Sequence, residues 1–313
     1  MKYIFGPVPS RRLGLSLGLD LIPFKTCSYN CVYCELGRTT HLTIERKPYV
    51  KAKEILDDLE AFFADKTHPP VDYITLGGSG EPTLNAELET IILGAKALKK
   101  APVAVLTNAS LIWQIEVQRA LLAADAVLPS LDAVTEGIWK KVNRPHPLLK
   151  IQQIVEGLKD FRQAYSGEIW LEVLFVKGIN DSKEEIERLK AEIEEINPER
   201  IQINTVVRPP AESGIAPLTE SELNVIKGIL GEKAEIIAHF KRHIDQQSSL
   251  EHLKEDILAM LKRRPCTLQD IAVALGVHMN GVVKMIDELQ KQGEIDTYEH
   301  SGKRFFVVKS LSR

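Results

Sequence analysis

The chain has 313 residues, of which 44% are hydrophobic and 27% are charged, with a formal net charge of -3. This composition is ordinary for a soluble globular protein, and the length suits more than one domain. The small negative charge argues against a general electrostatic affinity for nucleic acid, although it leaves a local basic patch open. No apolar run reaches the ~18 residues of a membrane span, and the start lacks the pattern of a secretory signal. We therefore expect a cytoplasmic protein without a membrane partner.

The first 16 residues contain several turn formers and two adjacent arginines, Arg11 and Arg12. One interpretation is an ordered N-terminal arm. The other is that both guanidinium groups contact an anionic substrate, since a guanidinium binds phosphate or carboxylate in bidentate fashion. A first strand is expected at 15–22, and it leads directly into a group of cysteines.

A regular alternation of helices and strands follows. Helical apolar spacing occurs at 49–66, 85–100, 110–124, in stretches across 134–164 and at 182–196. Strands are expected at 71–78, 102–108, 126–132, 169–176 and 201–207. This order predicts a parallel α/β sheet with right-handed crossovers.

Polar and glycine-rich segments stand where these strands end. They are 77–81, Thr107-Asn108, 130–132, 177–180 and Arg208. The carboxyl edge of parallel strands is where α/β sheets and barrels bind ligands. The cysteines follow the first strand and therefore share this edge.

The C-terminal part has a different pattern. Thr219 and Glu222 form a capping box that opens a helix, and a strand-like run at 235–240 is expected on the edge of the first domain. Residues 241–249 are polar and are interpreted as a linker. From 250 to 313, three helical segments and two strands around a turn resemble a winged helix. We therefore expect a first domain over 1–240 and a second over 250–313.

Three of the four cysteines, Cys27, Cys31 and Cys34, have the spacing C-x3-C-x2-C, and Cys266 lies far away. Thiolates suit zinc, copper(I) and iron–sulfur clusters. A triplet without a nearby fourth partner leaves one metal position open for a ligand, whereas a closed four-ligand site is usually structural. A structural zinc site would need His41 or Cys266, and neither has zinc-knuckle spacing. The spacing therefore favours a [4Fe–4S] cluster, and Cys266 is interpreted as a cysteine without chemistry.

The triplet, with the aromatic Tyr33 before its last cysteine, resembles the radical S-adenosylmethionine (SAM) superfamily. The resemblance covers about residues 15–207 and implies a partial (β/α)6 TIM-like barrel followed by the winged-helix domain. It also implies that SAM binds the open iron and is cleaved to a 5′-deoxyadenosyl radical that abstracts hydrogen from a substrate. An electron donor of the flavodoxin or ferredoxin type is then needed.

Other motifs match that superfamily and imply the SAM-binding residues. The segment Gly78, Ser79, Gly80 and Glu81 resembles the glycine–glutamate motif that contacts the methionine amino group. Asn108, Ser130 and Asp132 match strand-end positions that contact SAM in relatives, and Tyr33 is expected near the adenine. A glycine turn, strand-end caps, a turn asparagine and a packed aromatic are the corresponding structural interpretations.

The residues Lys177-Gly178-Ile179-Asn180-Asp181 resemble the molybdenum-cofactor branch of the superfamily. That branch has a second cysteine triplet, which is missing here, and an upstream arginine whose matching position is Asp20. Lys177 and Arg208 stay candidates for an anionic substrate, with solvated surface charge as the alternative. The segments around 6–14 and 204–210 resemble a radical SAM oxidoreductase family of archaea and bacteria, distantly akin to wyosine-forming tRNA enzymes.

The C-terminal domain allows two kinds of partner. Residues 250–313 contain ten Lys and Arg against nine Asp and Glu, which is unlike the basic face of a DNA-reading domain. Nucleic-acid binding and protein or peptide recognition both stay open, with Lys303 and Arg304 as the paired basic residues of the wing. The prediction is a radical SAM enzyme acting on RNA, a peptide or an anionic small molecule. The alternative is an iron–sulfur redox sensor that binds DNA through the winged helix.

Overall fold

The computed structural model describes residues 2–10, 12–65, 68, 70–238, 253–275, 277, 279–300 and 302–309. Arg11 and the predicted linker 241–249 lie outside these residues. Within them, no helix is both long and apolar enough to cross a membrane.

Eight strands form one sheet in the order β1-β2-β5-β6-β7-β8-β9-β10. β1 is antiparallel to β2, and every other neighbouring pair is parallel. Their bounds are β1 (Ile4–Ser10), β2 (Gly14–Leu19), β5 (Tyr73–Leu76), β6 (Val103–Thr107), β7 (Ala126–Pro129), β8 (Glu168–Phe175), β9 (Arg200–Thr205) and β10 (Ala234–Ile236). The six strands β2 and β5 to β9 are those predicted from the sequence, and their order in the sheet follows the chain.

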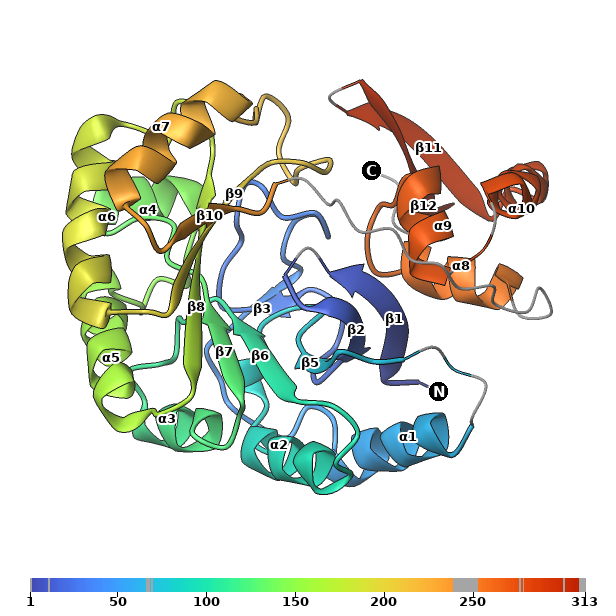
Figure 1. Ribbon diagram of the computed structural model, residues 1–313, viewed down its shortest axis with the longest axis horizontal. Helices are drawn as coiled ribbons and strands as arrows, with labels where there is room; N and C mark the ends of the chain where they lie inside the picture. Colours follow the sequence, from blue (N-terminus) through green and yellow to red (C-terminus); the bar gives the residue numbers. More distant parts are fainter. Residues whose placement is uncertain are drawn as a thin grey trace.

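The helices cover the outer face of this curved sheet (Figure 1). They are α1 (Ala52–Ala64), the short 3-10 helix η1 (Pro82–Leu84), α2 (Leu88–Ala97), α3 (Ile115–Leu121), α4 (Glu136–Val142), α5 (Ile151–Ala164), α6 (Lys183–Ile196) and α7 (Glu220–Leu230). Parallel strands joined through outer helices, with the two edges β1 and β10 unpaired to each other, make a partial barrel. The predicted fold class is confirmed.

The two edge strands extend the six-stranded core. β1 was expected only as an ordered arm, yet it pairs with β2, with an irregular register between Phe5 and Val8. Prolines are tolerated there because an edge strand has one side free of ladder hydrogen bonds. β10 pairs with β9, so the beginning of the strand-like run expected at 235–240 packs on the edge of the sheet, whereas residues 239–240 lie outside the described residues.

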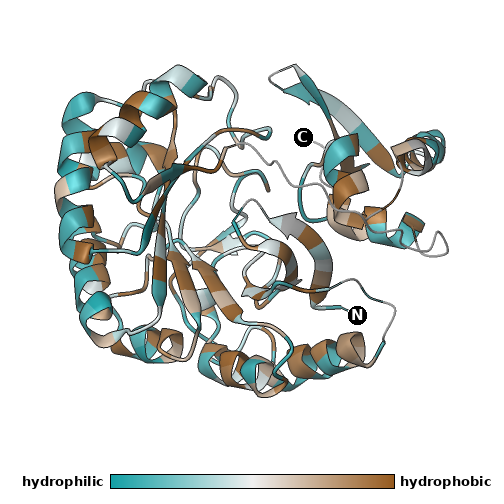
Figure 2. Cartoon of the chain, viewed as in Figure 1, coloured by the Kyte–Doolittle hydropathy of each residue, from teal (hydrophilic) through white to brown (hydrophobic). Residues whose placement is uncertain are grey.

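Alternation along the strands separates an outer core from the barrel interior. Leu17, Leu19, Ile74 and Leu76 are fully buried in the main core with the apolar faces of the helices. Side chains in the alternate positions point the other way, since successive residues of a strand face opposite sides. In Figure 2, apolar residues are frequent along the strands, and the surrounding helices carry both apolar and polar residues.

The C-terminal unit consists of three helices and a hairpin. These are α8 (Leu253–Leu261), α9 (Leu268–Leu275), α10 (Met279–Lys291), β11 (Ile295–His300) and β12 (Lys303–Val308). The unit has a core of its own, in which Cys266 is completely buried and forms an antiparallel bridge with Phe306. Three helical segments followed by two strands are the elements expected from the sequence for this part of the chain, and their assignment as a winged helix stays a prediction.

The unit lies beside the open edge of the barrel, where α8 and α9 contact β1 (Figure 1). Val8 of β1 packs against the C-terminal core. Arg263 stacks 4.4 Å from the centre of the Phe5 ring and forms an ion pair with Asp20, just beyond β2. The strand edge that the partial barrel leaves open is therefore covered by the chain's own C-terminal unit.

The capping box of α7 is formed as the sequence predicts. Thr219 Oγ1 accepts from the backbone N of Glu222 at 3.3 Å, and the Glu222 carboxylate accepts from the Thr219 backbone N at 2.7 Å. These bonds, with Lys177, lower the pKa of Glu222 to about 2.

We expect Thr219→Ala to lower the free energy of unfolding by about 1 kcal/mol, because a helix N-terminal donor loses its acceptor. Thr219→Ser, which keeps the hydroxyl, is the matched control and should stay near the parent. Since the folded pKa of Glu222 lies below the unfolded value near ~4.3, the contribution of the Glu222 carboxylate is present above that value. It is lost as pH falls toward 2. Urea titrations at pH 7 and pH 3 measure both effects; an equal loss for Ala and Ser would contradict the cap.

Candidate active site

The cysteine loop is held at the carboxyl edge of the sheet by its two ends. The short strand β3 (Thr26–Cys27) pairs with β4 (His41–Leu42). Farther along, the backbone N of Val32 donates to Val142 O, at the end of α4, and that of Asn30 donates to Asn143 O, just after it, both at 3.0 Å. The loop is thus fixed by backbone hydrogen bonds from two sides.

Each of the three cysteine sulfurs lies within reach of a different side-chain donor. Lys25 Nζ lies 3.3 Å from Cys34 Sγ, Asn108 Nδ2 lies 3.5 Å from Cys27 Sγ, and Asn143 Nδ2 lies 3.5 Å from Cys31 Sγ. Hydrogen bonds to sulfur stabilise the thiolate that a cluster needs and tune its reduction potential.

Burial opposes free thiolates in this loop. It raises the pKa of the Cys27 thiol to about 12 and that of Cys31 well above its usual range. A thiol in such surroundings becomes a thiolate when a metal takes the place of its proton. In the described part of the chain, no three His, Cys, Asp or Glu side chains are grouped to hold one metal ion. The partly buried, donor-flanked triplet fits a cluster in which each cysteine binds a separate iron.

The glycine-rich segment after β5 packs directly on the cysteine loop. A Cβ on Gly80 would lie 1.9 Å from the carbonyl oxygen of Thr26, and one on Gly78 would lie 2.5 Å from Asp20 Oδ1. The backbone N of Lys25 donates to Ser79 O at 2.7 Å, and that of Glu81 donates to Thr26 O at 3.2 Å. The absence of side chains here is therefore required by the protein's own close contacts.

Glu81 is 1% exposed, and its carboxylate is surrounded by donors. It accepts from Thr107 Oγ1 at 2.6 Å, from the Asn108 backbone N at 2.7 Å and from both the hydroxyl and the backbone N of Thr83. Burial raises the pKa of Glu81, and these bonds act in the opposite direction. Glu81 thereby positions Asn108, whose amide reaches Cys27.

Asp132, just beyond the end of β7, has three hydrogen-bond donors around its carboxylate. Its carboxylate accepts from Tyr33 Oη at 2.5 Å, from Asn143 Nδ2 at 2.7 Å and from the Leu174 backbone N at 2.9 Å. Burial raises the pKa of Asp132 to about 6. The predicted residues Tyr33 and Asp132 are thus brought together, while Ser130 lies two residues before Asp132 and bridges to Glu172 of β8.

The predicted substrate residues have different surroundings. Arg12 forms an ion pair with Glu172, and Arg208 pairs with Glu35 at 3.0 Å, directly after the third cysteine. Lys177 instead pairs with Glu222 at 2.9 Å at the start of α7, with half of its side chain exposed. These contacts keep Arg12 and Arg208 as candidates and give the expectation for Lys177 no support.

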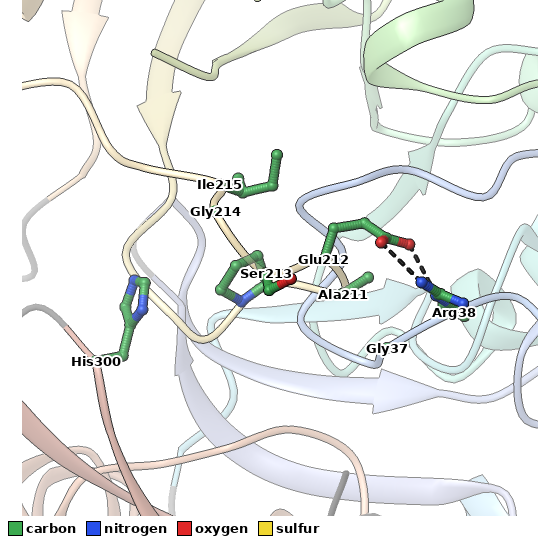
Figure 3. A pocket seen from close by; sticks show the side chains of 9 residues that line it. Gly37, Arg38, Ala211, Glu212, Ser213, Gly214, Ile215 and His300 are labelled. Carbon is green, nitrogen blue, oxygen red and sulfur yellow. Dashed lines mark hydrogen bonds and ion pairs between the residues drawn. The ribbon is translucent and has the colours of Figure 1, made fainter. Parts of the chain in front are cut away.

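The proline-rich segment after β9 is clamped to the cysteine loop. Glu212 binds Arg38 through two bonds of 2.8 Å, as Figure 3 shows, and also Arg144 at 2.6 Å. Beside this clamp lies a broad groove of about 660 Å3, lined by residues 210–215, Gly37, Arg38 and His300. The groove joins the cysteine loop, the proline-rich segment and the C-terminal hairpin.

Three side chains of this network were missed from the sequence. Lys25 stands two residues before Cys27, so its closeness to the triplet was a usable signal. Asn143 lies 109 residues after Cys34 in a helix-terminal position, and nothing in its local pattern indicated a sulfur contact. Asp20 was noted as a departure from another branch, but its bonds to the backbone N and hydroxyl of Ser79, at 2.8 and 2.9 Å, come from the fold.

Comparisons with known proteins agree with this geometry. Residues 21–191 match the family model described as Radical SAM superfamily. The chain is 35% identical to "UPF0026 protein MJ1312" of Methanocaldococcus jannaschii over 100% of this chain and 98% of that one. It is also 36% identical to a Brachyspira hyodysenteriae protein named "GTPase Obg", covering 94% of this chain but only 43% of that protein's length.

Solved structures share the fold. A radical SAM methyltransferase from Sphaerobacter thermophilus aligns with a TM-score of 0.52 at 15% identity, over 71% of this chain and 65% of that one. Streptococcus suis SuiB bound to S-adenosylmethionine aligns with a TM-score of 0.50 at 16% identity, over 67% of this chain and 45% of that one.

The chain therefore belongs to the radical SAM superfamily and to the UPF0026 proteins. The cofactors of this superfamily are a [4Fe–4S] cluster and SAM, which confirms the predicted cofactor pair. We therefore expect the cysteine loop and its three side-chain donors to serve one function, the binding of the cluster.

We expect Lys25→Met to lower the reduction potential of the reconstituted cluster by about 20–60 mV. Losing a positive donor to Cys34 destabilises the more negative, reduced cluster, and a hydrogen bond of ~0.5–1.5 kcal/mol corresponds to that range for one electron. A redox titration followed by electron paramagnetic resonance measures the shift. Lys53→Met, at an exposed position of α1 paired with Asp57, is the matched control; equal potentials in all three proteins would contradict the role of Lys25.

Proposed function

We propose that this protein is a radical SAM enzyme whose cluster is bound by Cys27, Cys31 and Cys34. The observation that carries the proposal is the partly buried triplet with one donor on each sulfur, packed against the glycine-rich segment that follows β5. When bound, the cluster supplies the electron that cleaves SAM to methionine and a 5′-deoxyadenosyl radical. An electron donor of the flavodoxin or ferredoxin type completes the reaction.

The chain's own residues position and shield these cofactors in the proposal. Gly78, Ser79, Gly80 and Glu81 present backbone groups beside the loop, and Asn108, Ser130 and Asp132 stand at neighbouring strand ends. The hydrogen bond from Tyr33 to Asp132 fixes the aromatic ring over that edge. Supporting this arrangement, Glu81 and Asp132 are both at most 2% exposed, so water has little access to their carboxylates.

The alternative, a DNA-binding redox sensor, receives less support. We propose that residues 250–313 form a winged-helix domain, in which α10 would be the DNA-reading helix. Lys291 of α10 forms an ion pair with Asp287 at 3.0 Å, and Lys254 of α8 pairs with Glu294 at 2.7 Å. Charges neutralised within the unit leave a weak surface for phosphates, which need unpaired cations. The contacts to β1 favour a role for the unit at the barrel.

The decisive test is anaerobic reconstitution with iron and sulfide, followed by dithionite and SAM. We expect 5′-deoxyadenosine and methionine to form. Cys34→Ser should reduce the rate at least ~100-fold and lower the iron content, because the cluster loses one of its three ligands. Cys266→Ala is the matched cysteine control and should keep both, since this thiol lies in the C-terminal core.

The alternative function, a DNA-binding redox sensor, predicts the opposite result for the same preparation. A redox sensor would form no 5′-deoxyadenosine and would bind specific DNA sequences tightly. That combination, measured by chromatography and by electrophoretic mobility shift, would overturn the enzyme proposal.

A further inference from the structure

A cavity of about 210 Å3 lies between the barrel interior and the end of α8. The barrel side is formed by inward-facing residues such as Ser16, Thr75 and Leu106, and the other side by Met260, Arg263 and Arg264. Two chain segments more than 150 residues apart in sequence thus share one enclosed space. The C-terminal unit is a wall of this cavity.

The cavity adjoins the cofactor edge. Gly77 and Gly78 of the glycine-rich segment line it, and so does Glu35, the residue that follows Cys34. Asp20 connects the two sides, because it binds both Ser79 and Arg263, which lies just after α8. A molecule in this cavity would lie next to the residues proposed to hold SAM.

The lining is rich in arginine, and three of its four arginines are paired with carboxylates. Arg12, Arg208, Arg263 and Arg264 face the cavity, against a single lining carboxylate, Glu35. Arg12 and Arg263 are paired with Glu172 and Asp20. The guanidinium of Arg264 forms no ion pair with any residue that the structure describes.

Arg208 provides the second observation. Its side chain is only 10% exposed, and one terminal nitrogen binds Glu35 at 3.0 Å. Its Nε is buried without a hydrogen-bond partner among the described residues. An unsatisfied buried donor is costly, by roughly 1–3 kcal/mol, so the Arg208 guanidinium keeps hydrogen-bonding capacity that its pair with Glu35 does not use.

We propose that this cavity binds the anionic group of a small substrate, with the guanidinium groups of Arg208 and Arg264 as its ligands. The inference rests on the radical SAM function proposed above and names its substrate class: a carboxylate or phosphate compound. The volume lies below the ~300–1,000 Å3 of drug-sized pockets, which suits a small anion and excludes a folded macromolecule. In this proposal, the C-terminal unit contributes to substrate recognition inside the barrel.

The test is isothermal titration of the reconstituted full chain, in the presence of saturating SAM and at low ionic strength. Inorganic phosphate and malonate are the two probes, and they distinguish a phosphate site from a carboxylate site. We expect one of them to bind with one site per chain. Arg264→Gln and Arg208→Lys should each weaken binding about tenfold or more, because each loses a charge-assisted or forked contact. Arg119→Gln, at an exposed position of α3, is the matched control.

The outcomes separate this proposal from the one it rests on. If 5′-deoxyadenosine forms but neither probe binds, or if Arg264→Gln binds like the parent, the anion site is overturned while the enzyme stands. Binding of a probe only when SAM is left out would also overturn it, because the arginines would then belong to the SAM carboxylate. Circular dichroism checks that Arg208→Lys is folded, and the partly exposed Arg264 gives a variant that leaves the core intact.

Discussion

The buried carboxylate of Glu81 is the contact on which the geometry of this edge depends. It joins the loop after β5 to the end of β6 through Thr83, Thr107 and Asn108. Because the amide of Asn108 then reaches Cys27 Sγ, the surroundings of one sulfur depend on a carboxylate that follows the neighbouring strand β5. A buried charge of this kind is stable only while every oxygen keeps its donors. The hydrogen bonds that hold this edge of the sheet together therefore also fix the geometry of the site.

A second hydrogen-bond network positions a donor on the other side of the cysteine triplet. Asp132 holds Tyr33 and Asn143, and Asn143 reaches Cys31. The third sulfur is served from within the loop by Lys25. Three donors from three regions of the chain thus converge on a segment of eight residues. Such outer contacts usually decide the orientation and potential of a metal site.

The C-terminal unit gives the partial barrel the wall that its open strand order lacks. Arg263 contacts both Phe5 of β1 and Asp20 beyond β2, so the unit is tied to the residues that support the glycine-rich segment. The barrel end and the unit enclose an arginine-rich cavity next to the cysteine loop. Asp20 and Ser79 would then lie between the proposed anion site and the residues proposed to hold SAM.

The sequence by itself determined the order of the elements, the six core strands and the cysteine triplet. These features are local: apolar periodicity, a capping box at Thr219 and Glu222, and the spacing C-x3-C-x2-C are all readable within a few residues. It also indicated the strand ends that gather at the site, because parallel strands present their carboxyl ends on one edge. It missed the strand character of Ile4–Ser10, where prolines hide the pattern.

Only the tertiary structure decided which side chains meet. Asn143 to Cys31, Glu81 to Asn108, and Arg263 to Asp20 join positions 112, 27 and 243 residues apart, and no local pattern encodes such pairs. The same limit applies to Lys177, because its pairing with Glu222 was not readable from the sequence, and its role toward a substrate stays a prediction. A motif fixes the kind of residue at a position, whereas its partners depend on how the whole chain packs.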